Sequence, residues 1–381
     1  MFYILLLVIR KRRSTLRPYI MSKNMKNNYC IIMAGGVGSR FWPVSTNEKP
    51  KQFLDFFGTG RSLLRMTYER LDGIVPASNV FVVTNKIYKE TILEQLPELE
   101  ENQVLLEPMR RNTAPCIAYA VYRIRKQNPK ANIVVLPSDH LITNEKEFQR
   151  VITEGLRFVA NNDALLTLGM KPTRPETGYG YIQLGKGGDD LRKVKTFTEK
   201  PNLEMAKVFL ASGEFAWNSG MFLWRADVII EEFNKHLSEV ADKFAEGEYA
   251  YGTDSEQDFI NRIYPLCPNI SIDYGIMEKA TNVYVMLADF GWSDLGTWSS
   301  LHELTPKDDN GNAVVKCEAM LYNAKDNMIA LPEGELAVIE GLDGYLVARD
   351  NGVLLICKKD EEAKIRQYVK DAEEKYGKKY V

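Results

Sequence analysis

The sequence predicts an α/β protein with a small β appendage at its C-terminal end. From Tyr29 onward, short apolar runs alternate with stretches of helical periodicity, which is typical of a mixed, mostly parallel sheet with helices on both faces. After residue 305 the pattern changes to short strands separated by glycine-containing turns. We therefore expect a disordered or non-native extension at 1–28, a three-layer domain at 29–305, and a β appendage with a terminal helix at 306–381.

The three-layer domain is predicted from apolar runs of strand length and from helical repeats that lie between them. Its middle region is expected to add longer, partly antiparallel strands that form a lid or an acceptor half. In chain order, the expected strands are Cys30–Met33, Val80–Thr84, Val104–Leu106, Ile133–Leu136, Ala164–Leu168, Tyr179–Leu184, Lys193–Glu199 and Gly220–Trp224. The expected helices are Ser62–Leu71, Glu90–Leu96, Thr113–Gln127, Glu145–Phe158 and Leu203–Ser212.

The appendage begins after a polar, turn-rich break at Asp308–Asn312. Short strands in series could wind as a fragment of a β-helix, and a charged helix at Glu361–Lys375 closes the chain. The expected strands of the appendage are Ala313–Cys317, Met328–Ala330, Leu336–Ile339, Tyr345–Ala348 and Val353–Ile356.

Composition excludes several classes of function. The net charge of −2 gives no general electrostatic basis for binding nucleic acid. The five cysteines lie far apart without a C-x-x-C pair, and the three histidines lack ligand spacing, so we expect a reducing, cytoplasmic location and no zinc site. The apolar run at Met1–Ile9 is too short to span a bilayer, and no stable membrane insertion is expected.

A glycine-rich turn follows the first strand and predicts a phosphate site. Backbone N–H groups of such a turn can cradle phosphate oxygens, and Arg40 and Lys51 add positive charge. The third position of a G-x-G-x-x-G fingerprint is Phe41, and Ser39-Arg40 follows Gly38 where a P-loop needs G-K-[ST], so neither familiar loop is present. The residues expected to touch the nucleotide here are Ala34, Gly35, Gly36, Gly38 and Ser39.

Two aspartates are candidates for holding Mg²⁺, which prefers oxygen ligands and bridges to substrate phosphates. Asp139 follows a buried strand beside Ser138, and Asp294 lies between two glycines and two tryptophans. For Asp139 the alternative role is an N-cap, although Thr143 or Asn144 is better placed for that.

Other polar motifs are individually weak signals. Lys200 offers a point charge for a second phosphate, and Asn218 can both donate to and accept from sugar hydroxyls. The segment Arg110-Arg111-Asn112 could face an anion or a base, or it could be a solvated approach to the following helix.

These segments together resemble the sugar-1-phosphate nucleotidyltransferases, over roughly residues 29–304. Their combination is far more specific than any one motif. The segments are AGGVGSRFWPVS with KPKQF (34–53), EPMRRNTAP (107–115), PSDH (137–140), ETGYGYI (176–182), FTEKP (197–201), WNSGMF (217–222) and GWSDLGTW (291–298).

The resemblance implies a Rossmann-like nucleotidyltransferase domain and a left-handed β-helix-like appendage. We also expect a homodimer, whose contacts the β appendage could supply. It implies in-line attack of α-mannose 1-phosphate on the α-phosphorus of GTP, giving GDP-mannose and pyrophosphate, with Mg²⁺ as cofactor. Arg40, Lys51, Asp139 and Asp294 would then be catalytic, and both aspartates would be metal ligands. Ser138, Arg111, Asn112 and Thr113 would contact the nucleotide, and Gly180, Glu199, Lys200 and Asn218 would bind the sugar phosphate.

Two alternatives stay open at this point. The first is a transferase of the same family that uses another base or another sugar. The second is a regulatory subunit that binds nucleotide sugar without turnover, but that role predicts a lost Arg40, Lys51, Asp139 or Asp294, and all four are present.

Overall fold

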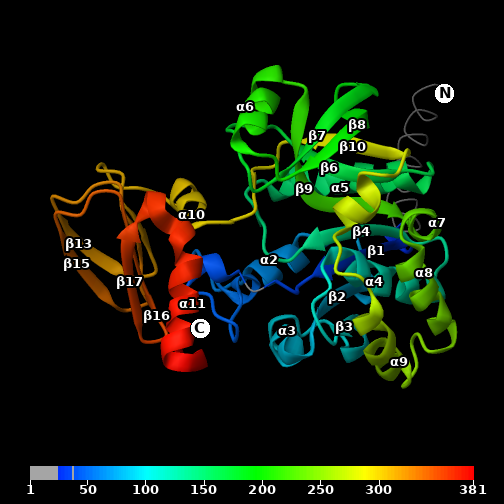
Figure 1. The fold of residues 1–381 in the computed structure, drawn as a ribbon, viewed down its shortest axis with the longest axis horizontal. Coiled ribbons are helices and arrows are strands. Elements are labelled where there is room, and N and C mark those ends of the chain that lie inside the picture. The colour runs from blue at the N-terminus through cyan, green and yellow to red at the C-terminus, as the bar shows by residue number, and fades with distance from the viewer. Residues whose placement is uncertain (1–24, 37) are drawn as a thin grey trace, which may run out of the picture. The chain divides into compact units, whose positions relative to one another are not determined.

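A computed structural model of the chain describes residues 25–36 and 38–381. They form two compact units, shown in Figure 1. The first unit contains the described residues up to Met33 together with Arg70–Pro137 and Asn144–Phe290. The second unit contains the described residues of Ala34–Glu69, Ser138–Thr143 and Gly291–Val381.

The sequence-based division stays a prediction. The expected extension at 1–28 lies outside the described residues as far as residue 24. The expected domain at 29–305 and the expected appendage with its terminal helix at 306–381 stay predictions as well.

A nine-stranded mixed sheet forms the centre of the first unit, in the order β3-β2-β1-β4-β9-β6-β10-β8-β7. β1 is parallel to both β2 and β4, whereas β9 is antiparallel to β4, β6 and β7. The strands are β1 (Asn28–Met33), β2 (Val80–Asn85), β3 (Val104–Glu107), β4 (Asn132–Pro137), β6 (Leu165–Met170), β7 (Gly180–Gly187), β8 (Leu191–Glu199), β9 (Phe215–Arg225) and β10 (Val283–Ala288).

The expectation of a mostly parallel sheet therefore holds for β1 to β4 and for the pair β6 and β10, whereas the other neighbouring strands pair antiparallel. Parallel pairing needs a long crossover, and helices supply it in that part of the chain. In the middle region β7 and β8 are joined by a short turn, which imposes antiparallel pairing. The expected strand at Gly220–Trp224 is longer than predicted, because β9 already begins at Phe215.

Helices cover both faces of this sheet because its strands are buried on both sides. Phe222 and Trp224 of β9 belong to the core formed with α4, α7 and α8. The alternate residue Leu223 points to the other face, where its side chain packs against Gly155 of α5. The helices are α3 (Lys89–Gln95), α4 (Thr113–Gln127), α5 (Glu145–Ala160), α6 (Leu203–Ser212), α7 (Ala226–His236), α8 (Ser238–Ala245) and α9 (Glu256–Ile263).

The second unit has its own apolar core. Phe41 packs against Trp298 with ring centroids 5.1 Å apart, and both side chains are buried. A two-stranded antiparallel sheet pairs β5 (Leu141–Ile142) with β11 (Trp292–Ser293). The helices of this unit are α2 (Leu63–Glu69), α10 (Trp298–Leu304) and α11 (Ile365–Tyr376).

The C-terminal part of this unit is a series of short parallel strands that alternate between two sheets. β12, β14 and β16 pair in parallel in one sheet, and β13 pairs in parallel with β15 in the other. This arrangement agrees with the expected β-rich appendage, while its left-handed coiling stays a prediction. The strands are β12 (Ala313–Val315), β13 (Glu318–Tyr322), β14 (Met328–Ala330), β15 (Leu336–Glu340), β16 (Tyr345–Asp350) and β17 (Val353–Lys358).

A buried pair of asparagines connects successive coils of this appendage. Asn327 donates from Nδ2 to Oδ1 of Asn312 at 2.9 Å, and the same Oδ1 accepts the backbone N–H of Asn327 at 3.1 Å. Oδ1 of Asn327 in turn accepts the N–H of Tyr345 at 2.8 Å. Each asparagine therefore satisfies a backbone donor of the next coil.

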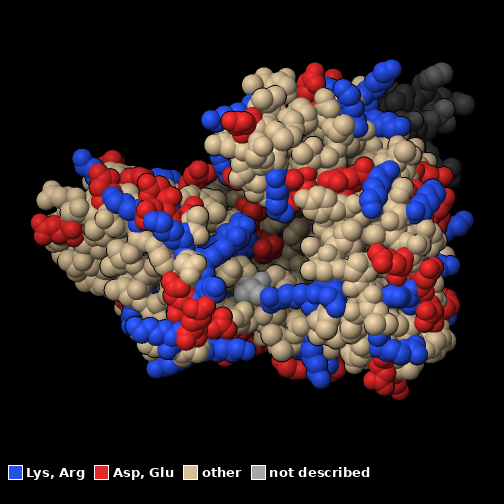
Figure 2. Space-filling view, in the orientation of Figure 1, with Lys and Arg blue, Asp and Glu red and all other residues tan. Residues whose placement is uncertain are grey.

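Charged side chains of both signs are interspersed on the face that Figure 2 shows. This distribution fits the small net charge of −2, because neither sign dominates the described surface drawn there. No helix among the described residues has the length and apolar character needed to cross a membrane.

Candidate active site

The glycine-rich turn is one part of the candidate site in the second unit. Gln52 donates from Nε2 to the carbonyl oxygens of Ala34 at 3.2 Å and Gly36 at 2.9 Å. Within the described ranges, the backbone N–H groups of Gly35, Gly36 and Gly38 have no hydrogen-bond partner. The turn therefore has its carbonyls held by protein while amide donors remain for an anionic ligand. Sequence reasoning missed Gln52, although it directly follows Lys51.

Gly38 allows the backbone of the turn to pack closely against the Lys51 side chain. Its φ of 66° lies in the left-handed region, and a Cβ there would come within 3.0 Å of the Cβ of Lys51. Only glycine meets both requirements, which explains this residue of the motif.

Lys51 is a buried ammonium that gathers the polar groups of the site. Nζ forms an ion pair with Oδ2 of Asp139 at 2.9 Å. It also donates to the carbonyl oxygens of Asp294 at 2.6 Å and Leu295 at 3.1 Å. The lysine thus connects three segments that are far apart in the sequence, while its role in catalysis stays a prediction.

Asp139 is held in its ionised form. Burial alone would raise the pKa of its carboxyl, but Lys51 and His140 together lower the pKa below its ordinary value. Nδ1 of His140 accepts a hydrogen bond from the Trp292 indole at 3.1 Å, so the ring proton lies on Nε2, 3.9 Å from Oδ1 of Asp139. Asp139 is therefore a charged oxygen donor at neutral pH.

Asp294 and Asp139 line the same pocket, whose volume is 280 Å³. Oδ1 of Asp294 accepts the backbone N–H of Gly296 at 2.9 Å, which fixes the carboxylate within its loop. Of the predicted site residues, this pocket brings together Gly38, Ser39, Arg40, Lys51, Asp139 and Asp294. Ser138, also predicted to contact the nucleotide, is buried and does not line it.

The donor set of the pocket suits Mg²⁺. The described residues contain no group of three or more His, Cys, Asp or Glu side chains that could enclose a metal ion. Two carboxylates with room for substrate oxygens and water match the usual coordination of Mg²⁺, which rarely has an all-protein cage. The Lys51 ammonium lies against Asp139, so this carboxylate already faces one positive charge.

Arg366 of α11 is a further cation that lines this pocket. Together with Arg40 and Lys51 it gives the pocket three positive groups beside its two aspartates. Sequence reasoning missed it, because a charged residue in a charged terminal helix carries no local signal of a ligand.

The predicted sugar-binding residues lie in the first unit and meet around the end of β8. Gly180 pairs with Glu199 across β7 and β8, and a Cβ at Gly180 would come within 3.0 Å of Oε2 of Glu199. Nζ of Lys200 donates to Oε1 of Glu199 at 2.6 Å. Asn218 of β9 donates to Oδ1 of Asp273 at 3.0 Å. Sequence reasoning did not include Asp273, because a lone aspartate in Ser-Ile-Asp-Tyr-Gly has no recognisable spacing.

Arg111, Asn112 and Thr113, which are predicted to contact the nucleotide, form hydrogen bonds within the first unit. Arg111 donates to the carbonyl oxygen of Pro265 at 2.7 Å, and Asn112 caps α4 by accepting the N–H of Thr113 at 2.9 Å. Oγ1 of Thr113 accepts the N–H of Ile272 at 2.9 Å. Contact of these residues with a nucleotide stays a prediction.

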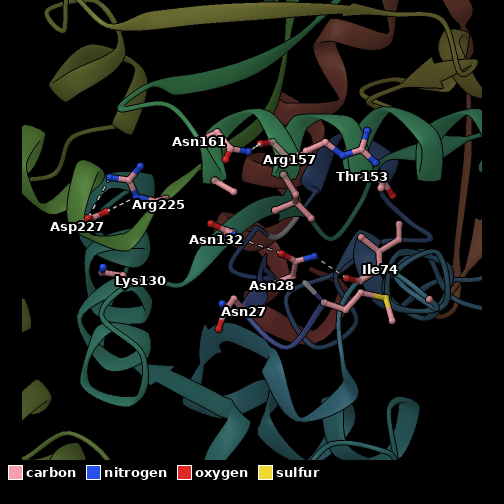
Figure 3. A pocket seen from close by; sticks show the side chains of 14 residues that line it. Asn27, Asn28, Ile74, Lys130, Asn132, Thr153, Arg157, Asn161, Arg225 and Asp227 are labelled. Carbon is pink, nitrogen blue, oxygen red and sulfur yellow. Dashed lines mark hydrogen bonds and ion pairs between the residues drawn. The ribbon is translucent and has the colours of Figure 1, made fainter. Parts of the chain in front are cut away.

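A larger pocket of 650 Å³ lies in the first unit at the amino ends of β1 and β4, as Figure 3 shows. Asn132 donates from Nδ2 to Oδ1 of Asn28 at 3.3 Å, and Arg225 pairs with Asp227 at 3.0 Å. It contains none of the predicted site residues, and its charged groups are partly neutralised within the protein. Size alone does not make it the candidate active site.

The chain is similar to known nucleotidyltransferases. A model of the nucleotidyl transferase family matches residues 29–311. The chain is 40% identical over 355 residues to the mannose-1-phosphate guanylyltransferase of Salmonella montevideo, covering 88% of this chain and 74% of the relative. It is 36% identical over 351 residues to the enzyme of that name from Escherichia coli, covering 89% and 74%.

A solved structure is also similar to this chain over most of its length. The crystal structure of mannose-1-phosphate geranyltransferase from Thermus thermophilus matches with a TM-score of 0.83 and 29% sequence identity, covering 91% of this chain and 99% of that one. The chain therefore belongs to the nucleotidyl transferase family, and the resemblance and mixed α/β fold expected from the sequence are confirmed. Its curated relatives named here are mannose-1-phosphate guanylyltransferases.

Proposed function

We propose that this chain transfers the guanylyl group of GTP to α-D-mannose 1-phosphate, giving GDP-mannose and pyrophosphate. The observation that carries the proposal is the convergence of Lys51, Asp139 and Asp294 in one pocket beside the glycine-rich turn. The names of the relatives support the choice of GTP and mannose 1-phosphate.

The pocket in the second unit would take the triphosphate. The N–H groups of the turn, Arg40 and Lys51 would hold the β- and γ-phosphates and stabilise the leaving pyrophosphate. Asp139 and Asp294 would hold Mg²⁺, which when bound neutralises charge on the phosphate oxygens. Because Asp139 stays ionised, it needs no loss of a proton before it can serve as a ligand.

The residues in the first unit would take the sugar phosphate. Lys200 would neutralise the incoming phosphate, while Glu199, Asn218 and the backbone of Gly180 would bind hydroxyl groups. The attacking phosphate oxygen is already anionic, so no general base is required. Catalysis would then consist of positioning and charge stabilisation. Arg111, Asn112 and Thr113, with Ser138, would contribute to the nucleotide side.

Three further expectations belong to this proposal. The enzyme would act in the cytoplasm, which fits five cysteines without a disulfide among the described residues. It would form a homodimer, and the C-terminal strands would coil with a left hand.

The test is a matrix of nucleoside triphosphates against sugar 1-phosphates, with pyrophosphate release as the readout and EDTA as the control. GTP with mannose 1-phosphate should give the highest kcat/KM, and EDTA should abolish turnover. A preference for another pair would replace the substrate assignment, and no turnover with any pair would support a binding subunit instead. Lys200→Ala should raise the KM for the sugar phosphate far more than that for GTP, and an equal effect on both would remove its assigned role.

A further inference from the structure

Asp273 is a carboxylate beside the proposed sugar-phosphate site that the reaction above does not use. It is half-buried and begins a π-helical turn, Asp273–Met277. Such turns are rare and occur often at functional sites. The start of this turn is fixed from outside, because the N–H of Ile272 donates to Oγ1 of Thr113 at 2.9 Å. Asp273 is thus placed by two segments of the chain.

The carboxylate of Asp273 holds one end of the Asn218 amide. Nδ2 of Asn218 donates to Oδ1 of Asp273 at 3.0 Å. At the other end, Oδ1 of Asn218 accepts from Oγ1 of Thr167 at 3.0 Å and from the N–H of Gly220 at 3.2 Å. These contacts leave no ambiguity about which end of the amide is the donor.

One donor position of Asn218 remains for a ligand. Oδ1 accepts the N–H of Gly220 and lies 3.0 Å from the Thr167 hydroxyl, which is also 3.3 Å from the carbonyl oxygen of Met221, and one of the two Nδ2 hydrogens is committed to Asp273. Among the described residues the second Nδ2 hydrogen has no partner. The expectation that Asn218 binds sugar hydroxyls stays a prediction, and its free Nδ2 hydrogen is the donor that the structure leaves for such a contact.

The charges around Asp273 show that it belongs to the same polar cluster as Glu199. Burial and the neighbouring Glu199 carboxylate raise the pKa of Asp273 to about 7, although Asn218 and Lys200 act in the opposite direction. Burial and Glu199 also raise the pKa of Glu278, while Lys279 lowers it. A ligand with hydroxyl donors and a phosphate would complement the carboxylates of Asp273 and Glu199 together with the Lys200 ammonium.

We propose that Asp273 is a positioning residue of the sugar-phosphate site, which orients the Asn218 amide so that its remaining N–H donates to a hydroxyl oxygen of the sugar. This inference rests on the proposed function for the identity of the ligand, a hexose 1-phosphate. A site built with a fixed donor discriminates against an analogue that lacks the hydroxyl oxygen, because the half-buried N–H then loses its partner.

The test compares two substitutions at Asp273. Asp273→Leu removes the acceptor at similar size and should raise the KM for mannose 1-phosphate roughly 5- to 10-fold, as expected for one lost hydrogen bond. The KM for GTP should stay within about twofold. Asp273→Asn keeps an oxygen that can accept from Asn218 and should restore most of the affinity. Glu278→Gln, a nearby carboxylate that does not contact Asn218, is the matched control and should leave both KM values unchanged.

A double-mutant cycle separates positioning from a general structural role. If Asp273 acts through Asn218, Asn218→Leu combined with Asp273→Leu should have the same KM for the sugar phosphate as Asn218→Leu alone. Additive effects would overturn the inference. So would an Asp273→Leu variant with an unchanged KM, or with equal changes for both substrates.

Calorimetric titration with mannose 1-phosphate alone distinguishes the two proposals, because it needs no turnover. Binding by the wild type without turnover would overturn the proposed function, and the weaker binding expected of Asp273→Leu would still support the role of Asp273. Equal binding by both proteins would overturn that role. No binding by the wild type would overturn both proposals.

Discussion

Replacement of Gly38 by alanine tests how the glycine-rich turn positions Lys51. The φ of 66° costs an alanine about 1–2 kcal/mol, because its Cβ crowds the backbone in the left-handed region. The new Cβ would also come within 3.0 Å of the Cβ of Lys51, an atom near the backbone that cannot swing away. Overpacking of this kind costs a further ~1–3 kcal/mol.

Gly58 supplies the matched control in the same unit. Its φ of 65° is nearly identical, yet nothing lies within 4 Å of the position that a Cβ would occupy. Gly58→Ala should therefore lose only about 1–2 kcal/mol of unfolding free energy and keep its activity. The difference between the two variants isolates the contact with Lys51.

The activity of Gly38→Ala should fall much further than its stability suggests. Lys51 holds Asp139 at 2.9 Å and the Asp294 carbonyl at 2.6 Å, so displacement of its backbone disturbs the whole phosphate pocket. A misplacement of about 1 Å can cost ~100-fold in rate. Urea unfolding followed by circular dichroism gives the stability, and pyrophosphate release gives kcat/KM. The reasoning is refuted if Gly38→Ala matches Gly58→Ala in both measurements.

Three other substitutions test further parts of the molecule. Arg366→Ala should raise the KM for GTP several-fold with little change in the KM for mannose 1-phosphate, and equal effects in steady-state kinetics would exclude a phosphate contact. Asp294→Asn should raise the Mg²⁺ concentration needed for half-maximal turnover, whereas a metal titration like that of the wild type would remove Asp294 from the site. Burial raises the pKa of Glu107 from its ordinary 4.5 to about 7, although Tyr264 and Cys116 donate hydrogen bonds to it. The folded protein thus keeps a proton that the unfolded chain releases, and this contribution to stability falls as pH rises from about 4.5 to 7. Glu107→Gln should flatten that part of the pH profile measured by urea unfolding, and an unchanged slope would contradict the assignment.

The first half of the sheet was predictable because its signals are local. The apolar run at Ile133–Leu136 lies within β4, and the helix expected at Thr113–Gln127 has those bounds in the structure. Burial on both faces produces continuous apolar runs, which sequence patterns detect well.

The predicted strand and helix bounds differ from the observed ones where contacts with other parts of the chain override the local sequence pattern. β9 begins at Phe215, although Asn218 and Ser219 interrupt its apolar run, because those polar side chains bond within the sheet. The strand β13 was not expected, since every residue of Glu318–Tyr322 is exposed or half-buried. The terminal helix α11 begins at Ile365 rather than at Glu361, because a 3₁₀ segment, Lys359–Lys364, comes first.

In the candidate site, too, residues in local motifs could be predicted, whereas a residue that acts through a distant contact could not. Arg40, Lys51, Asp139 and Asp294 were found because each lies in a motif of unusual composition, and the structure brings them to one pocket. Asp273 could not be found in this way, because its significance comes from Asn218, which lies 55 residues away in the chain.

The asparagine pair of the appendage has a consequence for how the length of this region can change. Asn312 and Asn327 each satisfy a backbone donor one coil further on, so every coil presents the next with the same polar interface. Stability in such an array is close to a sum of terms between neighbours. A duplication of one whole coil would reproduce both the parallel strand pairing and the buried amide, whereas a shorter insertion would break them. The length of the appendage can therefore change by whole coils without loss of either interaction.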